Sequence, residues 1–188
     1  MIRLERAVAG SPLLVRLLAD LPALGLPDAW IVAGAVAQTA WNQATGRPDG
    51  HGIADVDIVY HDAGDLSADG ERAAEARARD RFADLTLRLD VKNQARVHLW
   101  YPARFGRAIA PYRSTAEAVA TYPTTATAIA VRRSDRGLEC IAPFGMDDLF
   151  GLTVRPNRRL VSEAVYRAKA ARWQARWPEL RVLPWKPG

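Results

Sequence analysis

Ala-Asp-Val-Asp-Ile-Val-Tyr-His-Asp, residues 54–62, is the stretch of this 188-residue chain that decides its fold. Its centre is rich in β-branched and aromatic residues, which favour a strand. Side chains two apart on a strand point to the same face, with Cα atoms roughly 6–7 Å apart. We therefore expect Asp55 and Asp57 side by side at the start of the strand, with Val56 and Ile58 on the other face. Two such carboxylates repel each other unless a cation lies between them, and hard oxygen ligands suit Mg²⁺ or Mn²⁺.

The composition is that of a globular protein. Apolar residues make up 49% of the chain and charged residues 25%, and the net charge of +5 rests on arginine, with lysine only at positions 92, 169 and 186. Guanidinium groups bind phosphates bidentately, so this balance is compatible with a nucleotide or with RNA and selects neither. The single cysteine, Cys140, is expected to pack as a small hydrophobe. No apolar run is long enough to span a membrane and no signal peptide is evident, so we expect a cytoplasmic protein.

A strand that feeds directly into a helix precedes the carboxylates. Residues 30–33 are an apolar run that predicts a core strand, Gly34 ends it, and residues 35–42 are expected to form a helix. The unpaired amides at the start of such a helix, with the helix dipole, form a site for a phosphate. A glycine at this turn can equally serve packing alone.

A third carboxylate follows on a later strand. Residues 85–91 alternate apolar and polar side chains, and Asp90 lies near the end of this run. If this strand lies beside residues 55–61, Asp90 completes a carboxylate triad; otherwise it is an exposed strand-end residue or a helix cap. The turn-rich segment 45–52 is predicted to be a mobile loop that could cover the site.

The remaining patterns predict mainly helices. Helices are expected from Ser11-Pro12 onward and over residues 68–84 and 160–177, and a β-hairpin over residues 125–142. We find no linker or repeat and expect a single domain over residues 1–188, with a core at about 28–95 and helices, the hairpin and a C-terminal helix at about 96–188.

Taken in order, these features resemble the polymerase-β-like nucleotidyltransferase superfamily. Its signature is an apolar strand ending in glycine, a helix, a strand bearing Asp-x-Asp, and a third carboxylate on a later strand. The chain is more closely similar to a bacterial family of nucleotidyltransferase-like proteins, over roughly residues 28–185. The segments that carry this closer resemblance are Ala-Gly-Ala-Val at 33–36, Asp-Val-Asp-Ile-Val-Tyr at 55–60, Val-Lys-Asn-Gln-Ala-Arg-Val-His-Leu-Trp-Tyr at 91–101, Ala-Pro-Phe-Gly-Met-Asp-Asp-Leu-Phe at 142–150, Val-Arg-Pro-Asn at 154–157 and the Trp173, Trp177-Pro178 tail.

The resemblance implies an α+β fold, with a central mixed β-sheet, flanking helices and a C-terminal helical part. It also implies Mg²⁺-dependent (or Mn²⁺-dependent) transfer of a nucleoside monophosphate from an NTP to a hydroxyl group, with release of pyrophosphate. Two metal ions would be held by Asp55, Asp57 and Asp90, and Asp90 would help to deprotonate the acceptor. The phosphate contacts would come from Gly34, Ala35, Gln38, Lys92 and Arg96.

The implied partners are an NTP and an acceptor that is a small molecule, an RNA end or a protein, with no membrane and no duplex DNA. Two departures bear on this expectation: position 35 is alanine where the superfamily has serine or glycine, and the gap from Gly34 to Asp55 is long. An inactive nucleotide-binding or regulatory module of the same fold is therefore an alternative. A protein that binds RNA through its arginines is a third.

Overall fold

The computed structural model describes residues 1–186. Its elements are α1 (Ile2–Ala9), α2 (Pro12–Asp20), η1 (Leu21–Leu24), β1 (Trp30–Val32), α3 (Gly34–Ala44), β2 (Asp55–Tyr60), α4 (Ala68–Arg81), β3 (Arg88–Asn93), η2 (Gln94–Arg96), α5 (Val97–Phe105), α6 (Thr115–Val119), β4 (Ala130–Ser134), β5 (Gly137–Ile141), α7 (Asp147–Phe150), β6 (Thr153–Val154), α8 (Glu163–Gln174) and β7 (Arg181–Val182). The expected strand–helix–strand order, the hairpin and the long C-terminal helix are confirmed, although several predicted elements were drawn too long.

A mixed five-stranded sheet organises the fold, in the order β3-β2-β1-β4-β5. Strands β2 and β3 are parallel, and the other neighbouring pairs are antiparallel. Strands β6 and β7 form a separate two-stranded parallel sheet. The α+β fold with a central mixed sheet is thus the one expected.

The two faces of the sheet bury different clusters, as the period of two in a strand requires. Val56 and Ile58 are fully buried in the larger hydrophobic core, together with side chains from α1 to α4. Trp30, Val32 and Val59 point the other way, into a smaller cluster. Asp57 lies between Val56 and Ile58 and therefore shares the face of the smaller cluster.

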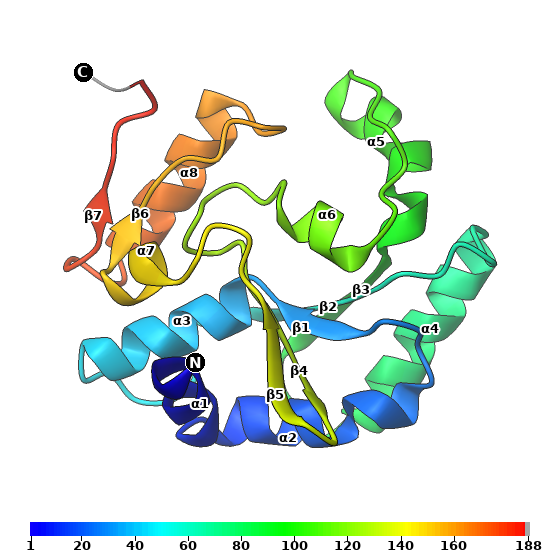
Figure 1. Cartoon of the computed structure of the whole chain (residues 1–188), viewed down its shortest axis with the longest axis horizontal. Helices are drawn as coiled ribbons and strands as arrows, with labels where there is room; N and C mark the ends of the chain where they lie inside the picture. The colour runs from blue at the N-terminus through cyan, green and yellow to red at the C-terminus, as the bar shows by residue number, and fades with distance from the viewer. Residues whose placement is uncertain (187–188) are drawn as a thin grey trace.

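Figure 1 shows how the helices divide between these faces. Helices α2, α3 and α4 lie on the side of the larger core, while α5, α6 and α8 rise on the other side, above β1, β2 and β3. Residues 97–119 and 163–174 are far apart in the sequence, yet they flank the same part of the sheet. This arrangement places the C-terminal helix on the face that carries the carboxylates.

Helix α2 begins where the sequence predicts, because Ser11 caps it and Pro12 occupies its first turn. The Ser11 hydroxyl accepts a hydrogen bond from the Leu14 amide at 3.3 Å. Helix α1 was not predicted; it buries Leu4 and Val8 in the larger core. No single helix among the described residues is long and apolar enough to cross a membrane, and the pair Ile2–Ala9 and Pro12–Leu24 satisfies that test only together, across a bend of 95°.

The segment 45–52 does not cover the site, which corrects the expectation of a mobile loop. The carbonyl oxygen of His51 accepts a hydrogen bond from Asn42 at 2.9 Å, and that of Gly52 accepts one from Arg176 at 2.6 Å. The indole of Trp177 is fully buried and donates to Asn42 at 2.8 Å. A Cβ at Gly52 would lie 2.4 Å from Trp177, so glycine is needed there for close packing. The loop is held by a tryptophan more than a hundred residues away, which local sequence does not indicate.

Candidate active site

The sheet register brings two of the predicted carboxylates directly together. Asp57 on β2 is paired with Asp90 on the parallel strand β3, and with Val32 on the antiparallel strand β1. Directly paired residues of adjacent strands project on the same face. Asp90 is therefore the neighbour of Asp57 that the sequence predicts. Asp55 lies two residues earlier on β2, on the same face and opposite Arg88.

Two of the three acids are bound to basic side chains. Asp55 forms an ion pair with Arg88 at 3.0 Å, and Asp90 forms one with Lys92 at 2.8 Å. Within residues 1–186, no group of three His, Cys, Asp or Glu side chains is arranged to hold a metal ion. The three-carboxylate metal site therefore stays a prediction, and Arg88 and Lys92 each hold one of its outer carboxylates.

Asp57 is the central acid and has no ion-pair partner among the described residues. Burial, together with the charges of Asp55 and Asp90, raises the pKa of its carboxyl from 3.8 to about 6. The charges of Lys169 and Arg88 oppose this shift without cancelling it, so further positive charge beside Asp57 would favour its ionised form. A divalent cation bound by oxygen ligands would supply that charge, so Asp57 with Asp55 and Asp90 fits a hard metal ion in its donor chemistry.

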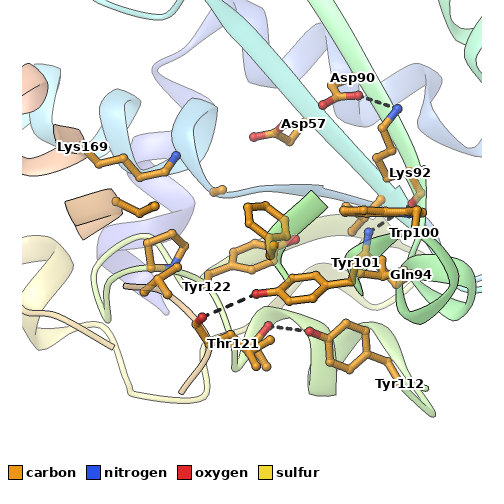
Figure 2. A pocket seen from close by; sticks show the side chains of 18 of the residues that line it. Asp57, Asp90, Lys92, Gln94, Trp100, Tyr101, Tyr112, Thr121, Tyr122 and Lys169 are labelled. Carbon is orange, nitrogen blue, oxygen red and sulfur yellow. Dashed lines mark hydrogen bonds and ion pairs between the residues drawn. The ribbon is translucent and has the colours of Figure 1, made fainter. Parts of the chain in front are cut away.

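Lys169 is a cation that the sequence analysis did not select. It projects from α8 toward Asp57, as Figure 2 shows, and it lines the same cavity. Burial and the neighbouring Arg172 lower the pKa of its ammonium group, whereas the charges of Asp57 and Asp55 oppose that shift. It forms no ion pair within residues 1–186, and its Nζ lies 5.9 Å from the centre of the Trp173 ring. Only the packing of α8 over the sheet shows that Lys169 belongs to the site.

The start of α3 follows β1 directly, but Gly34, Ala35 and Gln38 are not among the residues that line the cavity. Ala33 caps the helix with a left-handed backbone (φ 54°, ψ −116°) and lines the cavity. A Cβ at Gly34 would meet the Gln38 amide nitrogen at 3.0 Å, so glycine allows this side chain to lie over the turn. The Gln38 carbonyl oxygen is buried without a hydrogen-bond partner. Ala35 is fully buried and offers only its backbone amide.

The two predicted phosphate contacts after Asp90 are placed differently. Lys92 lines the cavity, and its ion pair with Asp90 raises its pKa against the opposing effect of burial. Arg96 is not among the residues that line the cavity. Its guanidinium donates to Glu71 at 2.5 Å, and both side chains are nearly buried. Glu71 also accepts the amide of Asn93 at 2.9 Å, so this pair joins the end of β3 to α4.

A cavity of about 530 Å³ extends from the carboxylates between α5 and α8. Asp57, Asp90, Lys92 and Lys169 line one end of it. The rest of its wall is mostly aromatic and aliphatic. Its side chains there include Trp100, Tyr101, Phe105, Tyr112, Tyr122, Leu160, Val161 and Val165. Nothing in the local sequence shows that the rings at 100 and 101 line the same cavity as the acids.

Comparison with known proteins is consistent with this site. A family model described as Nucleotidyltransferase matches residues 19–182. No curated protein matches the chain. A solved structure described as "The NMR structure of the protein reveals a CCA-adding enzyme head domain" is similar over 96% of this chain and 94% of its own, with a TM-score of 0.78 and 26% sequence identity. A "tRNA-processing enzyme (apo form 2)" shares the fold, with a TM-score of 0.52 and 20% identity over 89% of this chain and 44% of its own.

The matched residues include β1, the start of α3, both paired strands and α8, which are the elements that form the acidic end of the cavity. Because the match spans far more than half of the sequence, this chain belongs to the nucleotidyltransferase family and is a nucleotidyltransferase.

Proposed function

We propose that the protein transfers a nucleoside monophosphate from an NTP to a hydroxyl group at the wall formed by Asp57 and Asp90. The observation that carries the proposal is the direct pairing of these two acids at one end of a cavity of about 530 Å³. In this reaction the acceptor oxygen forms a bond to the α-phosphorus. The bond from that phosphorus to the β-phosphate oxygen breaks, and pyrophosphate leaves with the bonding electrons.

Asp55, Asp57 and Asp90 are the residues that would hold Mg²⁺ or Mn²⁺. A bound divalent ion supplies charge stabilisation for the phosphoryl oxygens and the leaving group. Asp57 is the ligand best suited by its surroundings, because no basic side chain among the described residues pairs with it. The ion pairs of Arg88 with Asp55 and of Lys92 with Asp90 would have to weaken when the ion binds.

The chain's own groups then have separate roles. Asp90 is placed next to Asp57 and would accept the proton of the acceptor hydroxyl, while Lys92 orients its carboxylate at 2.8 Å. Lys169 enters from the opposite wall and would bind phosphate oxygens as a point charge. The amides at the start of α3 would receive phosphate as well, beside Gly34, Ala35 and Gln38.

The chemical class of the acceptor is a further part of the proposal. The descriptions of the two structural neighbours name CCA addition and tRNA processing, and this chain carries a net charge of +5. An RNA end is therefore the first acceptor to test, followed by small-molecule and protein hydroxyls.

The test is pyrophosphate release with each of ATP, CTP, GTP and UTP in the presence of Mg²⁺ and these acceptors. We expect Asp90→Asn to lower the rate by about 10²–10⁴-fold, the range for a lost general base. Asp80→Asn removes the same charge from an exposed position of α4 and should leave the rate unchanged. A rate that survives in both Asp57→Asn and Asp90→Asn would refute the proposal.

The alternative of an inactive binding or regulatory module has one observation in its favour. Two of the three acids are already neutralised by Arg88 and Lys92, and Ala35 provides no hydroxyl. This alternative predicts stabilisation by an NTP with Mg²⁺ but no pyrophosphate release with any acceptor. Release that depends on Asp57 would eliminate it.

A further inference from the structure

The cavity has a second end whose character differs from the acidic one. Three of its rings, Trp100, Tyr101 and Phe105, come from α5, while Tyr112 and Tyr122 come from the chain on either side of α6. Figure 2 shows these labelled tyrosines and Trp100 around the space below Asp57 and Asp90. The two ends form one continuous cavity.

The rings of α5 lie outside the two core clusters, although Tyr101 itself is buried. Trp100, Tyr101 and Phe105 belong to neither of the two core clusters, and 50% of the Phe105 side chain is exposed. They pack against one another, with ring centres 4.5 Å apart for Tyr101 and Phe105 and 6.1 Å apart for Trp100 and Tyr101. Exposed aromatic surface gathered in a concave wall is typical of a ligand site.

Hydrogen bonds hold the tyrosines so that they present their rings. The Tyr101 hydroxyl donates to the Leu160 carbonyl at 3.5 Å, and the hydroxyls of Tyr112 and Thr121 are bonded at 2.9 Å. These polar groups are thus occupied within the protein. A ligand at this end meets chiefly aromatic faces, with Gln94, Arg107 and Ser162 as further polar residues of the cavity wall.

The start of α5 is fixed by buried polar contacts. Asn93 is fully buried, and its side chain binds the backbone of Asp62, Asp65 and Ala95 at 2.9–3.0 Å. Glu71 holds Arg96 in the turn that follows Asn93. The rings are therefore positioned before a ligand arrives, which lowers the entropy cost of binding.

We propose that the aromatic end is a stacking subsite for a nucleobase, formed chiefly by Trp100 with the neighbouring tyrosine rings. The inference rests on the proposed function, because the acidic end would hold the phosphates of the same nucleotide. A cavity of about 530 Å³ lies within the range that accommodates one ligand of this size. Stacking is tolerant of sequence because every base has an aromatic face. Because stacking carries the proposed binding, we expect the Trp100 ring to contribute similarly to all four bases.

The experiment compares nucleotides with a ligand that lacks a base. Dissociation constants are measured by calorimetry for ATP, CTP, GTP, UTP and inorganic tripolyphosphate, each with Mg²⁺. For Trp100→Ala we expect binding of all four nucleotides to weaken by about 5- to 150-fold, with tripolyphosphate binding unchanged. Trp100→Phe should restore most of the affinity. Leu99→Ala changes an exposed neighbour on the same helix, outside the cavity, and should behave as the wild type.

A second arm identifies the source of the base. The same variants are titrated with a short single-stranded RNA in place of the nucleotide. A loss for the four nucleotides alone assigns the subsite to the incoming nucleotide, and a loss for RNA alone assigns it to the acceptor end. Equal losses for nucleotides and tripolyphosphate, or no loss for nucleotides and RNA in a Trp100→Ala protein with normal thermal unfolding, would overturn the inference.

The two proposals fail in different ways. If the wild type binds neither nucleotides nor tripolyphosphate, the proposed function is wrong and the subsite with it. If it binds both and Trp100→Ala has no selective effect on a base, only the subsite is wrong.

Discussion

The Asp57 carboxylate should reduce the stability of the metal-free protein, and its removal should therefore stabilise the fold. The pKa of this carboxyl is raised from 3.8 to about 6 by burial and by two neighbouring acids. Between those two pH values the folded protein binds more protons than the unfolded chain. Stability consequently falls as pH rises through this window, and the deficit persists above pH 6. The change in pKa corresponds to about 3 kcal/mol.

The perturbation is Asp57→Asn, measured by thermal and urea unfolding from pH 4 to pH 8 in the presence of a chelator. We expect a gain of about 1–3 kcal/mol at pH 7.5, because the side chain is only partly buried and water screens some of the penalty. This corresponds to an increase in Tm of about 2–10 °C. The pH dependence between 4 and 6 should become flatter. Asp80→Asn, on the exposed side of α4, should follow the wild type.

Added Mn²⁺ should reverse the order of the two proteins. The wild type should gain stability by mass action, because only its folded state gathers the carboxylates, while Asp57→Asn should respond weakly. The reasoning would be refuted if the variant were less stable than the wild type at pH 7.5 without metal. It would also be refuted if the stability difference between the variant and the wild type did not grow between pH 4 and pH 6.

Three further predictions concern residues around this acid. Arg96→Ala should lower the unfolding free energy by about 3–5 kcal/mol, because it leaves the nearly buried Glu71 without its partner. At a temperature where the variant is folded, its affinity for tripolyphosphate should equal that of the wild type. A selective loss of this affinity would instead place Arg96 in the site. Arg88→Ala should tighten Mn²⁺ binding by about 2- to 5-fold, because the exposed pair with Asp55 competes with the ion; weaker binding in calorimetry would contradict this. Ala33→Gly should raise the unfolding free energy by about 1 kcal/mol, because glycine adopts the φ of 54° without strain. A lower unfolding free energy in urea denaturation would argue against backbone strain at Ala33.

The sequence predicts the paired acids because strand geometry is local and regular. The period of two places Asp55 and Asp57 on one face, and the parallel crossover through α4 brings Asp90 beside Asp57. These positions require only that two predicted strands be neighbours. The same holds for the start of α3, where the order of strand, glycine and helix determines the geometry of the backbone.

The other half of the site depends on packing between distant segments, which local patterns do not specify. Lys169 reaches the acids because α8 folds over the sheet, and Trp100 faces them because buried Asn93 and Glu71 fix the start of α5. Arg96 illustrates the opposite outcome. It lies near Asp90 in sequence, but its partner is Glu71, 25 residues earlier, so its charge is used inside the fold.

Costs in stability gather where β1, β2 and α3 meet. Ala33 adopts a backbone conformation that side chains disfavour, the Gln38 carbonyl oxygen is buried without a partner, and the Asp57 carboxyl has a raised pKa. Each of these is unfavourable in the free protein, and a cation bound beside Asp57 would offset the cost of its carboxylate. Comparable costs occur elsewhere, since the indole nitrogens of Trp41 and Trp173 in the larger core are also buried without a partner. Two of the three features, the Ala33 backbone and the Asp57 carboxyl, lie in the wall of the cavity and among the residues matched by the nucleotidyltransferase family model, where a charged substrate would bind under the proposed function.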